Sequence, residues 1–180
     1  PYNDEIVILD GVGYNFVGTW QAIVNIQSSR YVTFQNFEIR NNNLGRGLRV
    51  VSDISLSDYI EIKNCKINNS YYEGISIHGS NILVENCEIT NACMMNANFG
   101  APGTHPVALS SQWHSSQQFN ISTNITFKNN KVHDSWGEGI AFVRTDTFLC
   151  EGNKVYDCPY VLIYCDNAYN GIIKNNVMYG

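Results

Sequence analysis

The stretch Val84-Glu85-Asn86-Cys87-Glu88-Ile89 decides the fold, because five other stretches repeat its pattern. The central residue, Asn in five stretches and Gly in one, falls at positions 36, 64, 86, 129, 152 and 175, in steps of 28, 22, 43, 23 and 23 residues. A period near 23 with one long step predicts a solenoid in which one coil carries an insertion of about 21 residues. The other five stretches are Phe34-Gln35-Asn36-Phe37-Glu38-Ile39, Ile62-Lys63-Asn64-Cys65-Lys66-Ile67, Phe127-Lys128-Asn129-Asn130-Lys131-Val132, Cys150-Glu151-Gly152-Asn153-Lys154-Val155 and Ile173-Lys174-Asn175-Asn176-Val177-Met178.

Each repeat is expected to contain three short strands. The alternation in Asn81-Ile82-Leu83-Val84-Glu85 has the period of two that a strand requires. Asn or Gly then makes a sharp bend, because both tolerate left-handed backbone angles. A second strand, such as Cys87-Glu88-Ile89-Thr90, is followed after a variable turn by a third, such as Gly74-Ile75-Ser76-Ile77. This predicts an all-β parallel β-helix of about seven coils of about 23 residues, stacked about 4.8 Å apart with Asn ladders between coils.

The composition agrees with one strand-rich domain over residues 1–180, either complete or a segment of a longer β-helix. Asparagine accounts for 24 of 180 residues, and only 15% of the residues are charged. The formal net charge of −5 makes a nucleic-acid binder improbable, so we expect no nucleic-acid partner. No apolar run approaches the length that a membrane span needs, so no membrane insertion is expected.

Stacking also predicts where charged side chains meet. On two outer faces, residues one coil apart carry mostly opposite charges, as suits parallel strands in register. These exposed pairs are worth little energy each and mark structural faces. The two predicted columns are Lys63, Glu85, Lys128, Glu151 and Lys174, and Glu38, Lys66, Glu88, Lys131 and Lys154.

Three parts of the chain resemble a known family. These are Val132-His133-Asp134-Ser135-Trp136-Gly137-Glu138-Gly139-Ile140, the later Ile163-Tyr164-Cys165-Asp166-Asn167-Ala168, and the opening Val7-Ile8-Leu9-Asp10-Gly11. They look like the right-handed parallel β-helix repeats related to pectate lyases, and the resemblance covers essentially the whole chain. It implies a right-handed fold but leaves function open, since such folds include polysaccharide lyases, epimerases, hydrolases and non-catalytic surface proteins.

In enzymes of that family the substrate groove usually follows the outer face of the third strand, and this face differs from the other two. Aligning coils by their Gly-Ile positions gives an outward column of Asn25, Arg49, Ser76, Ala108, Ala141 and Tyr164. The next column is Gln27, Val51, His78, Ser110, Val143 and Asp166. At the start of the strand lie Arg46, Glu73, His105 and Glu138. This set predicts either an acid–base cluster or a ladder of salt bridges that holds the turn.

Two insertions, residues 92–104 and 112–123, flank the short strand Val107-Ala108-Leu109. Long loops on a rigid scaffold are where function tends to lie, so these loops are expected to form the walls of a cleft or, alternatively, to cover exposed core. Aromatic and imidazole side chains that would bind a sugar there, or cap the core instead, are Tyr71, Tyr72, Trp113, His114, Trp136 and Tyr160.

A lyase or epimerase acting on uronic acids needs a base that removes the proton next to the carboxylate and a cation that stabilises the resulting charge. The third-strand face has no lysine, which leaves His78, His105, Tyr164 and Arg49 as candidate bases. Hydrolysis would instead need a carboxylate pair such as Glu73 and Glu138. Calcium is a candidate cofactor with Asp166, or with Asp134 and Asp157 together, as its ligands.

The sequence therefore favours a secreted or cell-surface protein that binds polysaccharide. As its activity, the sequence favours lyase-type cleavage of uronic-acid polymers. Substrate binding is assigned to Arg46, Tyr71, Trp113, His114, Trp136 and Asp166, and catalysis to Arg49, Glu73, His78, His105, Glu138 and Tyr164. The alternative is a non-catalytic structural solenoid. Repeat-like sequence runs to both ends with no capping helix, which would let subunits associate end to end into a fibre.

Overall fold

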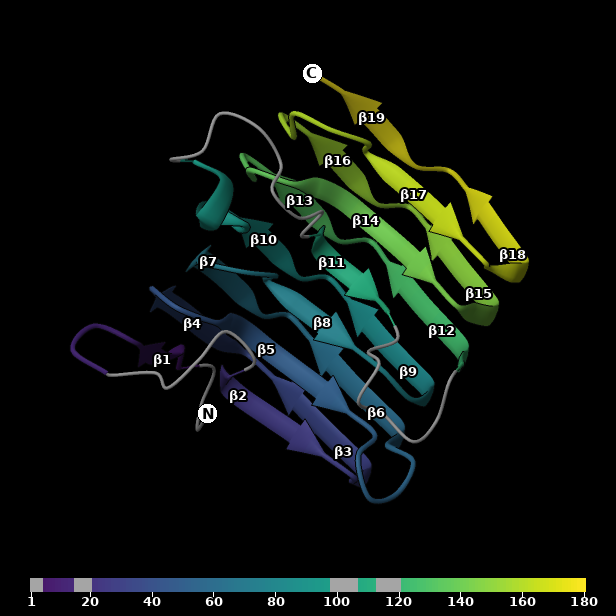
Figure 1. Cartoon of the computed structure of the whole chain (residues 1–180), viewed down its shortest axis with the longest axis horizontal. Coiled ribbons are helices and arrows are strands. Elements are labelled where there is room, and N and C mark those ends of the chain that lie inside the picture. The colour runs from purple at the N-terminus through teal and green to yellow at the C-terminus, as the bar shows by residue number, and fades with distance from the viewer. Residues whose placement is uncertain (1–4, 15–20, 98–106, 113–120) are drawn as a thin grey trace.

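The computed structural model describes residues 5–14, 21–97, 107–112 and 121–180. Within them the chain winds repeatedly through three parallel sheets, so that each turn adds one strand to each sheet (Figure 1). Sheet A contains β1 (Val7–Asp10), β4 (Phe37–Asn42), β7 (Lys66–Ser70), β10 (Glu88–Thr90), β13 (Lys131–His133), β16 (Lys154–Tyr156) and β19 (Val177–Tyr179). The predicted parallel β-helix is confirmed.

The other two sheets complete each turn. Sheet B contains β2 (Ala22–Gln27), β5 (Arg46–Val51), β8 (Ile75–Ile77), β11 (Val107–Ser111), β14 (Glu138–Val143) and β17 (Ile163–Asp166). Sheet C contains β3 (Arg30–Gln35), β6 (Asp58–Lys63), β9 (Ser80–Glu85), β12 (Ser122–Lys128), β15 (Thr145–Glu151) and β18 (Tyr169–Lys174). The described chain makes about six turns, slightly fewer than the seven expected, because sheets B and C have six strands each and only sheet A has a seventh.

Left-handed residues turn the chain at all three corners. The repeated position between sheets C and A has φ between 52° and 68° in every coil, which confirms the expected bend. The corner between sheets B and C also has positive φ, and so does the corner between sheets A and B. Asn dominates these positions because its short polar side chain tolerates that conformation. The three columns are Asn36, Asn64, Asn86, Asn129, Gly152 and Asn175; Tyr31, Tyr59, Asn81, Asn124, Thr147 and Asn170; and Asn41, Asn69, Asn91, Asp134 and Asp157.

The core is a stack of identical positions on the inner faces. Ile39, Ile67 and Ile89 follow one another up sheet A, and each is fully buried. Next to the C-to-A bend, a buried ladder of asparagines joins the later coils, where the Nδ2 of Asn130 donates to Asn153 and that of Asn153 donates to Asn176. The expected Asn ladder is therefore present, and it occupies the position after the bend.

The two outer charge columns are confirmed by the strand register, which pairs Lys63 with Glu85 in the first column and Glu88 with Lys131 in the second. The short helical segment η1 (Met94–Asn96) follows β10. Among the described residues, no helix is long and apolar enough to cross a membrane.

Candidate functional site

A buried ion pair lies at the start of the sheet B strands, between Arg46 at the start of β5 and Glu73 just before β8 in the next coil. Nε of Arg46 lies 2.7 Å from Oε2 of Glu73, and only 4% and 3% of these two residues are exposed. The side-chain amide of Gln112 donates to Oε1 of Glu73, and the Arg46 guanidinium lies 5.4 Å from the centre of the Tyr72 ring. Charged side chains are rarely buried this deeply unless they are paired, and this pair belongs to a network of four side chains, Arg46, Glu73, Gln112 and Tyr72.

Arg49 lies next to this pair, in the outward column of sheet B, and is half-buried. Burial lowers the pKa of the Arg49 guanidinium below its usual value, and the positive charge of Arg46 lowers it further. The carboxylates of Glu73 and Asp53 oppose that shift. An anionic ligand beside Arg49 would interact with the Arg49 guanidinium, because the charge of Arg46 is already paired with Glu73.

The strand register corrects two predicted columns. Ser110 pairs with Ser76 and Ala141, so Ser110 replaces Ala108 in the first column, and Gln112 takes the place given to Ser110 in the second. The same register places Val107 between Glu73 and Glu138, where His105 was expected. The cause is a slip of two residues in β11, which preserves the alternation of inward and outward side chains.

The predicted catalytic residues share this face but differ in access to solvent. Glu73, His78 and Glu138 are buried, Arg49 is half-buried, and Tyr164 is the exposed member at the far end of the column. His105, Trp113 and His114 lie outside the described residues. Of the other predicted binding residues, Tyr71 is half-buried with its ring against Tyr72, and Asp166 accepts a hydrogen bond from Asn167.

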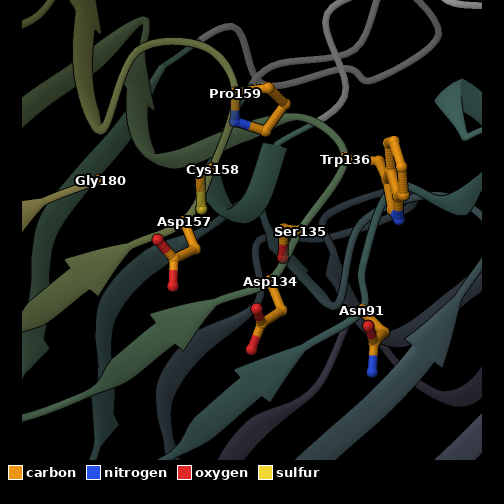
Figure 2. Close-up of a pocket in the computed structure, with 8 residues that line it drawn as sticks. All are labelled: Asn91, Asp134, Ser135, Trp136, Asp157, Cys158, Pro159 and Gly180. Atoms are coloured by element: carbon orange, nitrogen blue, oxygen red, sulfur yellow. The ribbon is translucent and has the colours of Figure 1, made fainter.

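A second site lies at the corner between sheets A and B, where a pocket of about 420 Å³ opens beside the predicted binding residue Trp136. Figure 2 shows Trp136 and Asp157 on opposite sides of the view, with Ser135 between them and Asp134 below Ser135. We call this the corner pocket. Its lining residues are Asn91, Asp134, Ser135, Trp136, Asp157, Cys158, Pro159 and Gly180.

The repeat positions the polar groups of the corner pocket. Asn91, Asp134 and Asp157 occupy the same left-handed corner position in three successive coils, with φ of 49°, 50° and 50°. Their side chains are therefore stacked about 4.8 Å apart along the helix axis. The backbone N–H of Trp136 donates to the Ala92 carbonyl, and the Asn96 side chain donates to the Trp136 carbonyl. The backbone under the indole is thus held in place, while 45% of Trp136 stays exposed.

Hydrogen bonds and burial set the charge of the pocket. Nδ1 of His133 lies 2.6 Å from Oδ2 of Asp134, and Nε2 of the same ring lies 3.2 Å from Glu88. Burial raises the pKa of the Cys158 thiol to about 11, with the Asp134 and Asp157 charges adding to the shift, so this thiol is neutral at ordinary pH. The pocket therefore presents an aromatic face, two carboxylates and an amide, and no thiolate nucleophile.

Sequence reasoning identified Trp136, Asp134 and Asp157 but missed the other lining residues and His133. The signal was available, because Asn91 lies at the position of the two aspartates in the repeat. A column of stacked rings on sheet A was also missed, in which His133, Tyr156 and Tyr179 have centroids 4.8 Å and 4.9 Å apart.

The candidate calcium ligands do not assemble a metal site. Among residues 5–14, 21–97, 107–112 and 121–180, no group of three or more His, Cys, Asp or Glu side chains is placed to hold a metal ion. Asp134 and Asp157 line one pocket, whereas Asp166 lies at the end of β17 in sheet B. Of the six to eight oxygen ligands that Ca²⁺ takes, the acidic side chains described at this corner would supply Asp134 and Asp157.

The stacked coils and left-handed corners define a parallel β-helix protein. The family model described as a right handed beta helix region matches residues 54–180, and the chain belongs to that family. No curated protein matches the chain. Among solved structures, trypsin-treated QnrB1, a plasmid-mediated fluoroquinolone resistance protein, is 12% identical and covers 91% of this chain and 92% of its own, with a TM-score of 0.20.

Proposed function

We propose that the chain is a carbohydrate-binding β-helix protein, secreted or displayed at a cell surface, that holds polysaccharide in the corner pocket. The observation that carries this proposal is that the half-exposed Trp136 and the carboxylates of Asp134 and Asp157, from two stacked coils, line the same cavity of about 420 Å³. Sugar rings have an apolar C–H face and a rim of hydroxyl groups. An exposed indole with nearby acceptors satisfies both.

The charges of the pocket select the kind of sugar. Asp134 and Asp157 accept hydrogen bonds from hydroxyl groups, and Asn91 both donates and accepts. The same two carboxylates repel the carboxylate of a uronic acid. A polymer of neutral sugars is therefore the better ligand for the corner pocket, and uronic-acid polymers would bind the arginine face of sheet B instead.

Calorimetric titration with soluble neutral and uronic-acid polysaccharides tests the proposal. We expect Trp136→Ala to weaken binding of the neutral polymer by about tenfold or more, because stacking on the indole is lost. Tyr169→Ala is the matched control, since Tyr169 is an exposed aromatic residue on sheet C, away from the pocket. Equal affinity for Trp136→Ala and wild type, or no binding by wild type across the panel, would overturn the proposal.

A second candidate function is lyase-type cleavage at the sheet B face, as resemblance to pectate lyases would imply. The specific observation is Arg49, whose lowered pKa is the direction that a guanidinium base requires. In this reaction, Arg49 would take the proton next to a uronate carboxylate and a double bond would form. The glycosidic bond to the next sugar would break as the oxygen of that bond gains a proton. A rise in ultraviolet absorbance from the unsaturated product, lost in Arg49→Lys, would support this activity. A flat trace with uronic-acid polymers would refute it.

The structural alternative is end-to-end assembly, in which a second copy would stack on the coil that contains β18 and β19. Ile173 and Met178 lie in register with the buried Cys150 and Val155, yet they are 46% and 50% exposed. A second copy stacked on this coil would cover them and continue all three sheets. Sedimentation velocity over a range of concentrations tests it, and a constant monomer mass that Ile173→Lys leaves unchanged would refute it.

A further inference from the structure

Two tyrosines form a stacked pair on the opposite side of the coil, at the corner between sheets B and C. Tyr31 and Tyr59 occupy the same position in adjacent coils, next to the register pair of Arg30 and Asp58. Their ring centroids lie 5.1 Å apart with an angle of 8° between the planes. Tyr31 is 75% exposed and Tyr59 is 49% exposed, so neither ring contributes much to the core.

Both tyrosines have a backbone conformation that bulky residues avoid. Their φ angles are 58° and 54°, whereas the same column otherwise holds asparagines at 81, 124 and 170 with φ of 51° to 53° and the smaller Thr147 with φ of 58°. A bulky residue in the left-handed region is strained, and such outliers cluster where a ligand is held. Because the exposed rings gain little from burial to offset this strain, the pair is better explained by binding than by folding.

The stack of tyrosines stops after Tyr59, because the next residue in the column is shorter. The coil after Tyr59 carries the shorter Asn81 in the same column, so the face of the Tyr59 ring that is turned away from Tyr31 is not covered by a third ring. A cavity of about 520 Å³ lies here, and both tyrosines line it. We call this cavity the tyrosine step. Its other lining residues are Thr33, Glu61, Asn81, Ile82, Leu83, Asn124 and Thr126.

Hydrogen bonds hold the floor of the tyrosine step. Oε2 of Glu61 accepts from the Lys63 ammonium at 2.8 Å and from the Thr33 hydroxyl at 3.2 Å. The hydrogen bond from Lys63 lowers the pKa of Glu61 below its usual value, so the carboxylate is charged and accepts hydrogen bonds at neutral pH. Asn81 is fixed through Nδ2, which donates to Asp58 at 2.8 Å. The step thus combines a flat aromatic face with oriented hydroxyl, amide and carboxylate groups.

We infer that the tyrosine step is a second carbohydrate site, in which a neutral pyranose ring stacks on Tyr59 and bonds its hydroxyl groups to Glu61 and Asn81. A neutral sugar fits because Lys63, the ammonium group beside Glu61, is already paired with it. An anionic ligand would meet the Glu61 carboxylate. The inference extends the proposed function, since a chain with sites at two corners would bind one long polymer, or two polymers, with avidity.

The test replaces each tyrosine with the residue that the column normally carries. The double variant Tyr31→Asn/Tyr59→Asn suits the left-handed backbone and removes the rings, so we expect an unchanged or higher melting temperature. The matched control is Thr147→Asn, a replacement in the same column at the other end of the helix, where φ is 58°.

Binding is measured with cello-, xylo- and manno-oligosaccharides in a Trp136→Ala background, so that the corner pocket does not contribute. We expect the tyrosine double variant to lose about tenfold or more of the remaining affinity, while Thr147→Asn retains it. A Trp136→Ala protein that binds none of these sugars overturns the tyrosine step and leaves the corner pocket standing. Unchanged affinity in the double variant, or a fall of several degrees in its melting temperature, also overturns the inference, the latter because the rings would then be structural.

Discussion

Replacing Asn153 with alanine should destabilise the protein far more than an ordinary asparagine substitution. The Asn153 side chain is fully buried and bridges two coils, because Oδ1 accepts from the backbone N–H of Asn130 at 2.9 Å and Nδ2 donates to the carbonyl of Phe127 at 2.9 Å. Alanine leaves both groups without these partners where water does not reach. At about 1–3 kcal/mol for each such group, the free energy of unfolding should fall by about 3 kcal/mol. For a chain of this size, that loss lowers the melting temperature by about 6–12 °C.

Thermal unfolding followed by circular dichroism measures this effect, with Asn68→Ala as the matched control. Asn68 also belongs to a ladder, in which the Asn91 side chain donates to it at 3.1 Å, but this contact is exposed. Water replaces the lost hydrogen bond there, so the cost should stay below about 0.5 kcal/mol. If Asn153→Ala and Asn68→Ala shift the melting temperature equally, burial of the ladder is not what stabilises the stack of coils.

Three further measurements probe other parts of the structure. Arg46→Ala leaves the Glu73 charge buried without its ion pair and should cost about 3–5 kcal/mol in chemical denaturation, whereas a cost under 1 kcal/mol would show that water reaches this pair. A thiol reagent at pH 8 should label the exposed Cys165 and spare the buried Cys158, whose pKa is about 11; fast labelling of all six thiols in the folded protein would contradict this. Hydrogen bonds lower the pKa of Asp10 to about 2, so its contribution to stability is present above the usual value of 3.8 and is lost as the pH falls towards 2; an NMR titration midpoint near 3.8 would refute this.

The repeat made most of the fold predictable, because stacking converts sequence spacing directly into contacts. Once the period was recognised, the charge columns followed, and the register pairs Lys66 with Glu88 as expected. The error in β11 has a physical cause. The step of 43 residues between Asn86 and Asn129 contains no Gly-Ile mark, and a slip of two residues leaves every inward side chain inward. Alternation of inward and outward residues cannot distinguish two registers that differ by two residues. The column that Ser110 occupies could therefore be assigned only from the structure.

Part of the candidate site was predictable from the sequence, because residues in the repeated turns can be recognised there, whereas the burial of residues on the outer face of a sheet cannot. Trp136 and Asp134 were found because they belong to a turn whose residues repeat, whereas the burial of Glu73 and His78 depends on what covers the face of sheet B. The alternation of residues within a strand does not show which other segments of the chain lie over its outer face. The sequence therefore indicated which side chains share a face, but not which of them solvent reaches.

Departures from the repeat are the best guide to function in this chain, because each corner position is already constrained by its left-handed backbone. Asparagine satisfies that constraint at low cost and is the common residue in all three corner columns. Where a column changes to aspartate, at 134 and 157, the corner pocket opens, and where another changes to tyrosine, at 31 and 59, the tyrosine step forms. Thr147 also departs from asparagine in its column and lines neither cavity, so it is the cavity beside these two pairs that distinguishes them. The two proposed carbohydrate sites would give a physical reason for the aspartate pair in one corner and the left-handed tyrosine pair in the other.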